Sequence, residues 1–169
     1  MCLDVDGVLT DGRLWVDDQG RGARAFYVQD GLAIRWFEKL GGVVVICSGK
    51  RSEAVAARAG ELGLKHVIQG STDKLTDVQS VLVSLGLTFA QTAVIGDDLP
   101  DLPLMQQCGF PIAVANAVDE VKHAARLVTR RAGGQGAIRE AFEHLLKQTG
   151  RWSQVLAHYG VEEAFRGSE

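Results

Sequence analysis

Short apolar runs alternate along the chain with longer segments in which apolar residues recur at helical spacing. The runs consist largely of Val and Ile without intervening polar residues, which is typical of strands buried on both faces of a parallel sheet. We expect strands over residues 1–5, 43–47, 66–69, 92–96 and 112–115. We expect helices between them over residues 31–40, 52–62, 74–85, 99–108, 118–125 and 137–148. The alternation predicts an α/β fold built on a doubly wound parallel sheet.

One segment near the N-terminus interrupts this alternation. Two extended stretches, 12–16 and 22–28, flank a turn-rich tetrad at 17–20, and this pattern predicts a β-hairpin inserted after the first strand. Its apolar positions are Leu14, Val16, Phe26 and Val28. The hairpin is either an additional ribbon at the sheet edge or a flap that covers a site or pairs with another subunit.

The chain has 169 residues, which fits a single domain. We expect a core domain over residues 1–150, which includes the hairpin 12–28, and a C-terminal tail over residues 151–169. Within the tail, residues 151–165 repeat apolar side chains at helical spacing. Two interpretations of that helix remain open: it packs on its own domain, or it reaches the active site of a neighbouring subunit.

Charge and hydropathy narrow the classes of function. The formal net charge is −3 and no basic stripe is present, which argues against nucleic-acid binding. No apolar run approaches the roughly 18 to 20 residues of a membrane span. The first residues show neither the basic start nor the apolar stretch of a signal peptide, and the three cysteines form no CxxC pattern. We therefore expect a cytoplasmic protein with reduced thiols.

Chemically active residues follow the predicted strands at their carboxyl ends, where ligands bind in open parallel sheets. The first strand leads into Asp4 and Asp6, the second into Ser48, the third toward Lys74, and the fourth into Asp97. Clustered carboxylates repel one another and need a cation when buried. Oxygen ligands without histidine or thiolate favour Mg²⁺, and a hydroxyl, a lysine and glycine amides suit a phosphate.

These residues together favour phosphoryl transfer to an aspartate. If Asp4 and Asp6 both lie on the first strand, their side chains point to one side and address one substrate. Each signal is weak by itself: the Asp4–Asp6 pair is also typical of a solvated turn, Asp97 and Asp98 of a helix cap, and Lys74 of a surface residue. Their order and strand context favour a functional site.

Four segments in this order, DVDGVLTDG (4–12), SGKRS (48–52), GSTDK (70–74) and GDDLPD (96–101), resemble the four motifs of the haloacid dehalogenase superfamily of phosphatases. The likeness runs from Asp4 to about Gly150. Within the superfamily, the chain more narrowly resembles the capless members that act on 3-deoxy-D-manno-octulosonate 8-phosphate. It implies a Rossmann-like fold without a cap domain, since only the hairpin is inserted between the first two motifs.

The resemblance also implies a role for each matched position. Asp4 is the nucleophile that forms an aspartyl-phosphate, and Asp6 is the general acid and then the general base. Mg²⁺ is held by the Asp4 carboxylate, the Asp6 backbone carbonyl and Asp97. Ser48, Gly49 and Lys74 hold the phosphoryl group. Asp98 and Asp101 support the metal shell or orient Lys74, and Thr10 is a further supporting residue.

The second motif departs from the usual Thr-Gly-Arg of this superfamily. Ser48 keeps the hydroxyl, but Lys50 replaces an arginine and loses its bidentate geometry. The candidates for recognising the carboxylate of a sugar acid are therefore Lys50, Arg51 and Arg58. Relatives of this kind close their sites by assembly, so we expect a homotetramer joined through the hairpins and a small sugar phosphate as the substrate.

Three alternatives stay open. The first is a phosphatase for another acid sugar phosphate, such as N-acylneuraminate 9-phosphate, which would share every catalytic residue. A receiver-type signalling module would have its phosphorylated aspartate at the end of the third strand, where this chain has Gln69 and Gly70. A catalytically silent assembly domain would not be expected to keep the full set of acidic, hydroxyl and lysine residues.

Overall fold

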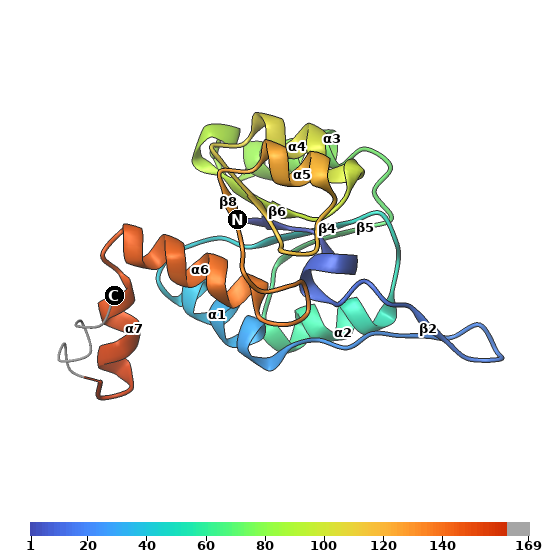
Figure 1. Ribbon diagram of the computed structural model, residues 1–169, viewed down its shortest axis with the longest axis horizontal. Coiled ribbons are helices and arrows are strands. Elements are labelled where there is room, and N and C mark those ends of the chain that lie inside the picture. The colour runs from blue at the N-terminus through green and yellow to red at the C-terminus, as the bar shows by residue number, and fades with distance from the viewer. Residues whose placement is uncertain (162–169) are drawn as a thin grey trace.

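The computed structural model describes residues 1–161. Its main sheet has six parallel strands in the order β5-β4-β1-β6-β7-β8 (Figure 1). The strands are β1 (Cys2–Leu3), β4 (Val45–Ser48), β5 (His66–Gln69), β6 (Ala93–Gly96), β7 (Phe110–Ala113) and β8 (Leu127–Val128). Because the chain winds outward from β1 in both directions, the sheet is doubly wound, as predicted.

Helices cover both faces of the sheet (Figure 1). One layer contains α3 (Lys74–Ser84), α4 (Leu102–Gln107) and α5 (Asp119–Ala124). The other contains α1 (Val28–Lys39), α2 (Glu53–Leu62) and α6 (Ala137–Gln148), and α1 packs along α6. A further helix, α7 (Trp152–His158), follows α6 and packs against it. None of the helices in residues 1–161 has the length and apolarity needed to cross a bilayer.

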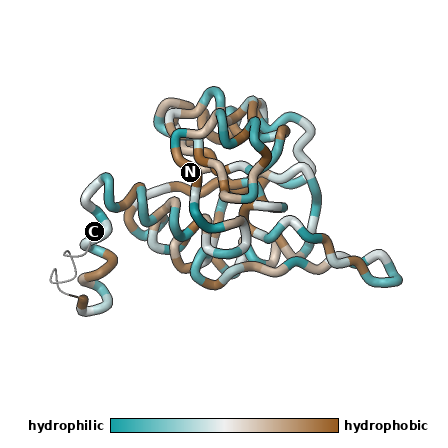
Figure 2. Tube along the Cα trace, in the orientation of Figure 1, coloured by the Kyte–Doolittle hydropathy of each residue, from teal (hydrophilic) through white to brown (hydrophobic). Residues whose placement is uncertain are grey.

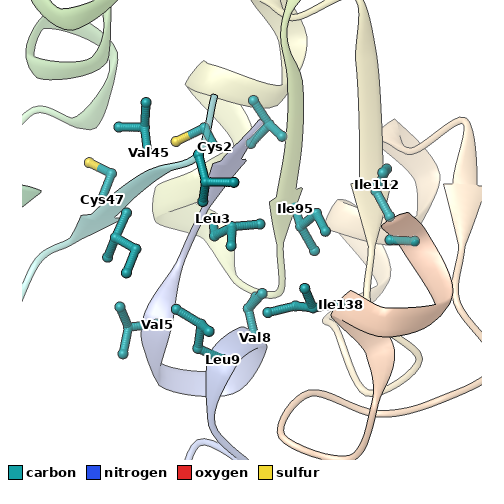
Figure 3. Close-up of a cluster of buried hydrophobic side chains, with 14 of the residues drawn as sticks. Cys2, Leu3, Val5, Val8, Leu9, Val45, Cys47, Ile95, Ile112 and Ile138 are labelled. Carbon is teal, nitrogen blue, oxygen red and sulfur yellow. The ribbon is translucent and has the colours of Figure 1, made fainter. Parts of the chain in front are cut away.

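The core extends over both faces of the sheet, and Figure 3 shows the part of it around the central strands and α6. Leu3, Ile95 and Ile112 come from neighbouring strands, and Ile138 from α6 packs toward them. All four side chains have no exposed surface. Each contributes about 1.5 to 3 kcal/mol by its burial, so this cluster holds the sheet rigid beneath its carboxyl edge.

The first strand is shorter than predicted. Strand β1 ends at Leu3, Asp4 continues in extended conformation, and residues Val5–Leu9 form one irregular helical turn, η1. Gly7 in this turn has a φ of +104°, which side-chain-bearing residues rarely adopt. Asp6 therefore lies in the turn and not on the strand, so the strand-alternation argument for the pair Asp4 and Asp6 was wrong.

Other boundaries shift for identifiable reasons. The helix expected over 99–108 is divided into a 3₁₀ turn, η3 (Leu99–Asp101), and α4, because Pro100 and Pro103 each begin a new turn. Strand β7 starts two residues before the predicted 112–115. Strand β8 was not predicted, since two residues are too few to show periodicity. A further 3₁₀ turn, η2 (Phe89–Gln91), precedes β6.

The hairpin is present but its ladder is short. Only β2 (Trp15–Val16) and β3 (Gly22–Ala23) pair, in antiparallel register. The ribbon extends away from the rest of the molecule and carries a hydrophobic stretch behind a hydrophilic tip (Figures 1 and 2). Leu14, Trp15 and Val16 are exposed, whereas Phe26 packs against the core. Val28 is exposed at the start of α1 and not on the hairpin.

Candidate active site

The candidate site lies at the carboxyl edge of the central strands, where the sequence placed it. Asp4 directly follows β1, Ser48 ends β4, and Asp97 directly follows β6. Lys74 is the first residue of α3, on the connection that leaves β5. Since β1 pairs with both β4 and β6, residues from three of the four motifs emerge from adjacent strands.

An ion-pair cluster forms the floor of the site. The ammonium of Lys74 donates to Asp4 Oδ1 over 2.6 Å and to Asp101 Oδ1 over 2.7 Å. The side chains of Lys74, Asp4 and Asp101 are only 11%, 10% and 4% exposed. In such an environment electrostatic interactions are stronger than at the surface, and each charge needs a partner.

Asp101 is a supporting residue with its hydrogen-bonding capacity already used. Its Oδ1 accepts from Lys74, while its Oδ2 accepts from the backbone amides of Asp97 and Asp98, at 3.0 and 3.4 Å. One carboxylate thus fixes the direction of Lys74 and the shape of the turn after β6. The superfamily resemblance implied that Asp101 either supports the metal shell or orients Lys74. Its hydrogen bond with Lys74 supports the second role.

The carboxylates of the site carry more negative charge than Lys74 offsets. Carboxylate oxygens of Asp4, Asp97 and Asp101 all lie within 4.8 Å of one another, and Lys74 supplies one positive charge against three negative ones. Burial, followed by repulsion from Asp101, raises the pKa of Asp4 to about 6. Burial, followed by repulsion from Asp4 and Asp101, raises the pKa of Asp97 to about 7.

Lys74 responds in the opposite direction. Burial alone lowers its pKa, but the carboxylates of Asp101 and Asp4 more than offset this, and the pKa lies above its ordinary value. Lys74 therefore stays cationic throughout the physiological range. A divalent cation between Asp4 and Asp97 would neutralise the remaining charge, and hard oxygen ligands of this kind suit Mg²⁺. The residues present fit the ion that the sequence predicted.

The nucleophile loop is shaped by close backbone packing. A methyl group on Gly7 would overlap the carboxylate of Asp97, so the two motifs touch at this point. A methyl group on Gly133 would overlap the Gly7 carbonyl oxygen, which places the glycine-rich segment against the first motif. Thr10 is fully buried, donates to the Val5 carbonyl at 3.2 Å, and accepts from the Gly7 amide at 3.4 Å. These hydrogen bonds stabilise the conformation of the loop.

The second motif forms the turn that follows the end of β4. The Ser48 hydroxyl, 3% exposed, accepts a hydrogen bond from the Lys50 amide at 3.2 Å, and Gly49 lies exposed between them. Lys50 and Arg51 are exposed on the same turn. The Arg51 side chain extends along the exit of β5, since a methyl group on Gly70 would meet it.

Two predicted residues have other partners. Asp98 caps η3 by accepting from the Leu99 amide at 2.8 Å, which is the helix-cap alternative. Arg58 on α2 pairs with Glu61 at 2.8 Å and packs against Gly31 of α1. The Asp98 side chain also accepts from the backbone amide of Asp101 in the capping box of η3. Within residues 1–161, no ion pair or hydrogen bond links the Arg58 side chain to the carboxylate cluster.

Asp6 has a partner that the sequence analysis missed. Arg24, on the returning arm of the hairpin, donates through Nε to Asp6 Oδ1 at 2.7 Å and through Nη2 to Asp6 Oδ2 at 3.3 Å. Its Nη1 donates to the Ser52 hydroxyl at 2.7 Å. Nothing in the sequence around Arg24 predicts that its side chain contacts Asp6 and Ser52, because it is a single arginine between two alanines. These contacts are seen only in the folded structure.

Comparisons with known proteins agree with this geometry. Residues 63–141 match the family model of haloacid dehalogenase-like hydrolases. The 3-deoxy-D-manno-octulosonate 8-phosphate phosphatase of Yersinia pestis is 41% identical over 146 residues, covering 86% of this chain and 78% of that protein. A 3-deoxy-D-manno-octulosonate 8-phosphate phosphatase of Moraxella catarrhalis, solved in complex with magnesium, phosphate and the sugar acid, superposes with a TM-score of 0.91.

That structure is 39% identical, and the match covers 94% of this chain and 91% of the other. The cobalt-bound octulosonate phosphatase of Haemophilus influenzae gives a TM-score of 0.85 at 40% identity, with 88% and 87% of the two chains covered. Fold, motif geometry and sequence identity over most of both chains agree: this chain belongs to the haloacid dehalogenase-like hydrolases, in the family of the 3-deoxy-D-manno-octulosonate 8-phosphate phosphatases.

Proposed function

We propose that the chain hydrolyses 3-deoxy-D-manno-octulosonate 8-phosphate to the free sugar acid and inorganic phosphate, with Mg²⁺ as its cofactor. The observation that carries the proposal is the cluster of Asp4, Lys74 and Asp97 at the strand ends, in a chain about 40% identical to phosphatases of this substrate. The magnesium, phosphate and sugar acid found in the Moraxella catarrhalis structure support the same assignment.

In the first half-reaction, a carboxylate oxygen of Asp4 attacks the phosphorus and the bond to the sugar oxygen breaks. Asp6 donates a proton to that leaving oxygen, which departs as the sugar hydroxyl. Lys74, held by Asp101 beside Asp4, is placed to stabilise negative charge on the phosphoryl oxygens. Ser48 and the amide of Gly49 supply donors on the other side of the nucleophile.

In the second half-reaction, Asp6 accepts a proton from water while the water oxygen attacks the phosphorus. The bond to Asp4 breaks, inorganic phosphate leaves, and both carboxyl groups return to their starting state. Asp4, Asp97 and the Asp6 carbonyl are the residues that would hold Mg²⁺, which when bound offsets the negative charge of the carboxylates and the phosphate. Lys50 and Arg51 remain our candidates for the sugar carboxylate.

The assembly, the pathway and the location of the enzyme are part of the same proposal. The exposed apolar residues of the hairpin favour a homotetramer in which hairpins pack together. We propose that the activity belongs to lipopolysaccharide biosynthesis and is cytoplasmic, and the substrate named for the relatives supports this proposal. Arg58, which pairs with Glu61 on α2, stays the third candidate for the sugar carboxylate.

The alternatives have less support. A receiver module needs its phosphorylated aspartate after the third strand, but β5 ends in Gln69, and Asp4 follows β1. A silent assembly domain has no need for the paired Lys74 and Asp4. The relatives described above bear the octulosonate name, which favours this substrate over the nine-carbon acid sugar phosphate.

A phosphate-release assay tests the proposal. Octulosonate 8-phosphate, N-acylneuraminate 9-phosphate and para-nitrophenyl phosphate are each supplied with Mg²⁺ and with a chelator. We expect the highest kcat/KM for the octulosonate, and no turnover of any substrate after chelation. A preference for the nine-carbon substrate would contradict the assignment, and full activity after exhaustive chelation would contradict the metal site.

A further inference from the structure

The hairpin places one arginine inside the candidate active site. Arg24 is only 7% exposed, although its neighbours Gly22 and Ala23 are exposed and the ribbon extends away from the domain (Figure 1). A buried guanidinium is costly unless its charge and its donors are matched. Here the charge is matched by Asp6, whose side chain is 19% exposed, through the two hydrogen bonds described above.

The two bonds restrict how Asp6 can point. Because Arg24 addresses both carboxylate oxygens in a forked arrangement, it fixes the plane of the carboxylate as well as its position. A lysine would contact the Asp6 carboxylate at a single point, so the carboxylate could still rotate about its Cβ–Cγ bond. The direction of the Asp6 oxygen lone pairs toward the leaving oxygen or the attacking water is therefore set by a residue outside the four motifs.

Arg24 is itself anchored on its far side. Its third hydrogen bond goes to the Ser52 hydroxyl, and the Ser52 amide donates to Gln69 Oε1 at 2.7 Å at the end of β5. The guanidinium thus bridges the first motif, through Asp6, and the second motif, through Ser52. A shift of the returning hairpin arm would change the orientation of Asp6 directly.

We propose that Arg24 is a positioning residue that orients the Asp6 carboxylate for proton transfer and makes the hairpin part of the catalytic apparatus. This inference rests on the proposed function only in taking Asp6 as the acid and base. When Asp6 takes a proton from the attacking water, the oxygen–phosphorus bond forms and the Asp4–phosphorus bond breaks. With a leaving group that needs no proton, misorientation of Asp6 slows this step without preventing the attack of Asp4.

The test separates the two half-reactions with para-nitrophenyl phosphate, whose leaving group needs no proton. In Arg24→Gln, rapid mixing should show a burst of nitrophenolate close to one equivalent, followed by a steady rate about 10² to 10⁴ times lower than that of the wild type. Acid-quenched protein should carry phosphate on the Asp4 peptide in a larger fraction than the wild type. KM should fall with kcat, since the slow step follows the covalent one.

Three further variants sharpen the result. Arg24→Lys should recover part of the steady rate, because it keeps the charge but not the fork. Ser52→Ala should cause a smaller change in the same direction, since it releases only the far anchor. The matched control is Arg21→Gln on the same hairpin, where the side chain is 78% exposed and pairs with Asp17; it should behave as the wild type.

Several outcomes would overturn the inference. Loss of the burst together with the steady rate in folded Arg24→Gln or Arg24→Lys would assign Arg24 a general structural role, and raised KM with unchanged kcat would assign it to substrate binding. Failure of the proposed substrate would appear separately, in the wild type, as lack of turnover of octulosonate 8-phosphate. The aryl phosphate experiment does not depend on that result.

Discussion

The carboxylate of Asp30 on α1 accepts a hydrogen bond from the backbone amide of Arg139, 2.7 Å away in the first turn of α6. A second bond, from the Gly136 amide at 3.3 Å, reaches its other oxygen. A helix thus receives its N-terminal cap from a different helix, which locks α1 to α6. The cap is 1% exposed, and burial raises the pKa of Asp30 to about 6 despite these bonds.

The raised pKa of Asp30 predicts a pH-dependent stability. Between about pH 4 and 6 the folded protein holds a proton on Asp30 that the unfolded chain has released, so the free energy of unfolding falls as the pH rises through this range. The ordinary pKa is 3.8, and the difference from about 6 corresponds to roughly 2 to 3 kcal/mol. Denaturant unfolding at several pH values, with Mg²⁺ saturating, measures it.

Asp30→Asn is the matched variant for this measurement. It keeps one acceptor for the Arg139 amide but cannot titrate, so its free energy of unfolding should change less between pH 4 and 6. The difference between the two curves isolates Asp30 from the other carboxyls. Parallel curves for wild type and Asp30→Asn would show that Asp30 does not titrate in this range.

Removal of Lys74 should affect both activity and metal-dependent stability. Lys74→Gln leaves Asp4 and Asp101 without their ammonium, so we expect a loss of about 3 to 5 kcal/mol of stability under chelation. Mg²⁺ should restore part of this loss, because it offsets the same charge. Turnover should fall by at least about a hundredfold.

Thermal unfolding of wild type and Lys74→Gln, each with Mg²⁺ and with chelator, checks this prediction. We expect Mg²⁺ to stabilise the variant more than it stabilises the wild type. The charge argument fails if the variant gains no more from Mg²⁺ than the wild type does.

Neighbouring aspartates should differ sharply in their effect on metal binding. Asp97 faces the carboxylate cluster, whereas Asp98 caps η3. Asp97→Asn should lose most Mg²⁺ affinity in calorimetric titration and most turnover. Asp98→Asn should keep an Mg²⁺ affinity much closer to that of the wild type. It should lose at most about 1 kcal/mol of stability, since asparagine is also a good cap. Similar losses of Mg²⁺ affinity in the two variants would refute the assignment.

The hairpin should mediate self-association. Trp15 and Val16 are 61% and 65% exposed, and burying them between subunits would stabilise an assembly by about 1.5 to 3 kcal/mol per side chain. Replacing both with aspartate should convert a tetramer to smaller species in sedimentation velocity experiments. Asp18→Asn at the exposed hairpin turn serves as the control. A wild type that sediments as a monomer would contradict the proposed tetramer.

The sequence was most informative where chemistry and chain order coincide. Asp4, Lys74 and Asp97 each follow a strand, and parallel strands deliver their carboxyl ends to one edge, so their proximity was predictable. Strand β5 was predicted with its observed bounds because its polar and glycine flanks are unambiguous. The resemblance implied that Asp101 supports the metal shell or orients Lys74, and its hydrogen bond with Lys74 supports the second role.

The sequence was least informative where a side chain reaches across the fold. Arg24 contacts Asp6 and Ser52, and nothing in its local pattern distinguishes it from Arg21 on the same hairpin. The early end of β1 depends on how Gly7 meets Asp97 and Gly133, which are distant in sequence. The tail was predicted helical over 151–165; α7 accounts for part of it and packs on its own domain, while residues 162–165 lie outside the described residues.

The contact between Gly7 and Gly133 joins the first motif to a segment near the other end of the chain. During synthesis on the ribosome, the strands that carry Asp4, Ser48 and Asp97 emerge before the glycine-rich segment does. The sheet can begin to form at that stage, but the nucleophile loop still lacks the backbone against which it packs. We therefore expect catalytic competence only after the segment that precedes α6 has emerged and docked.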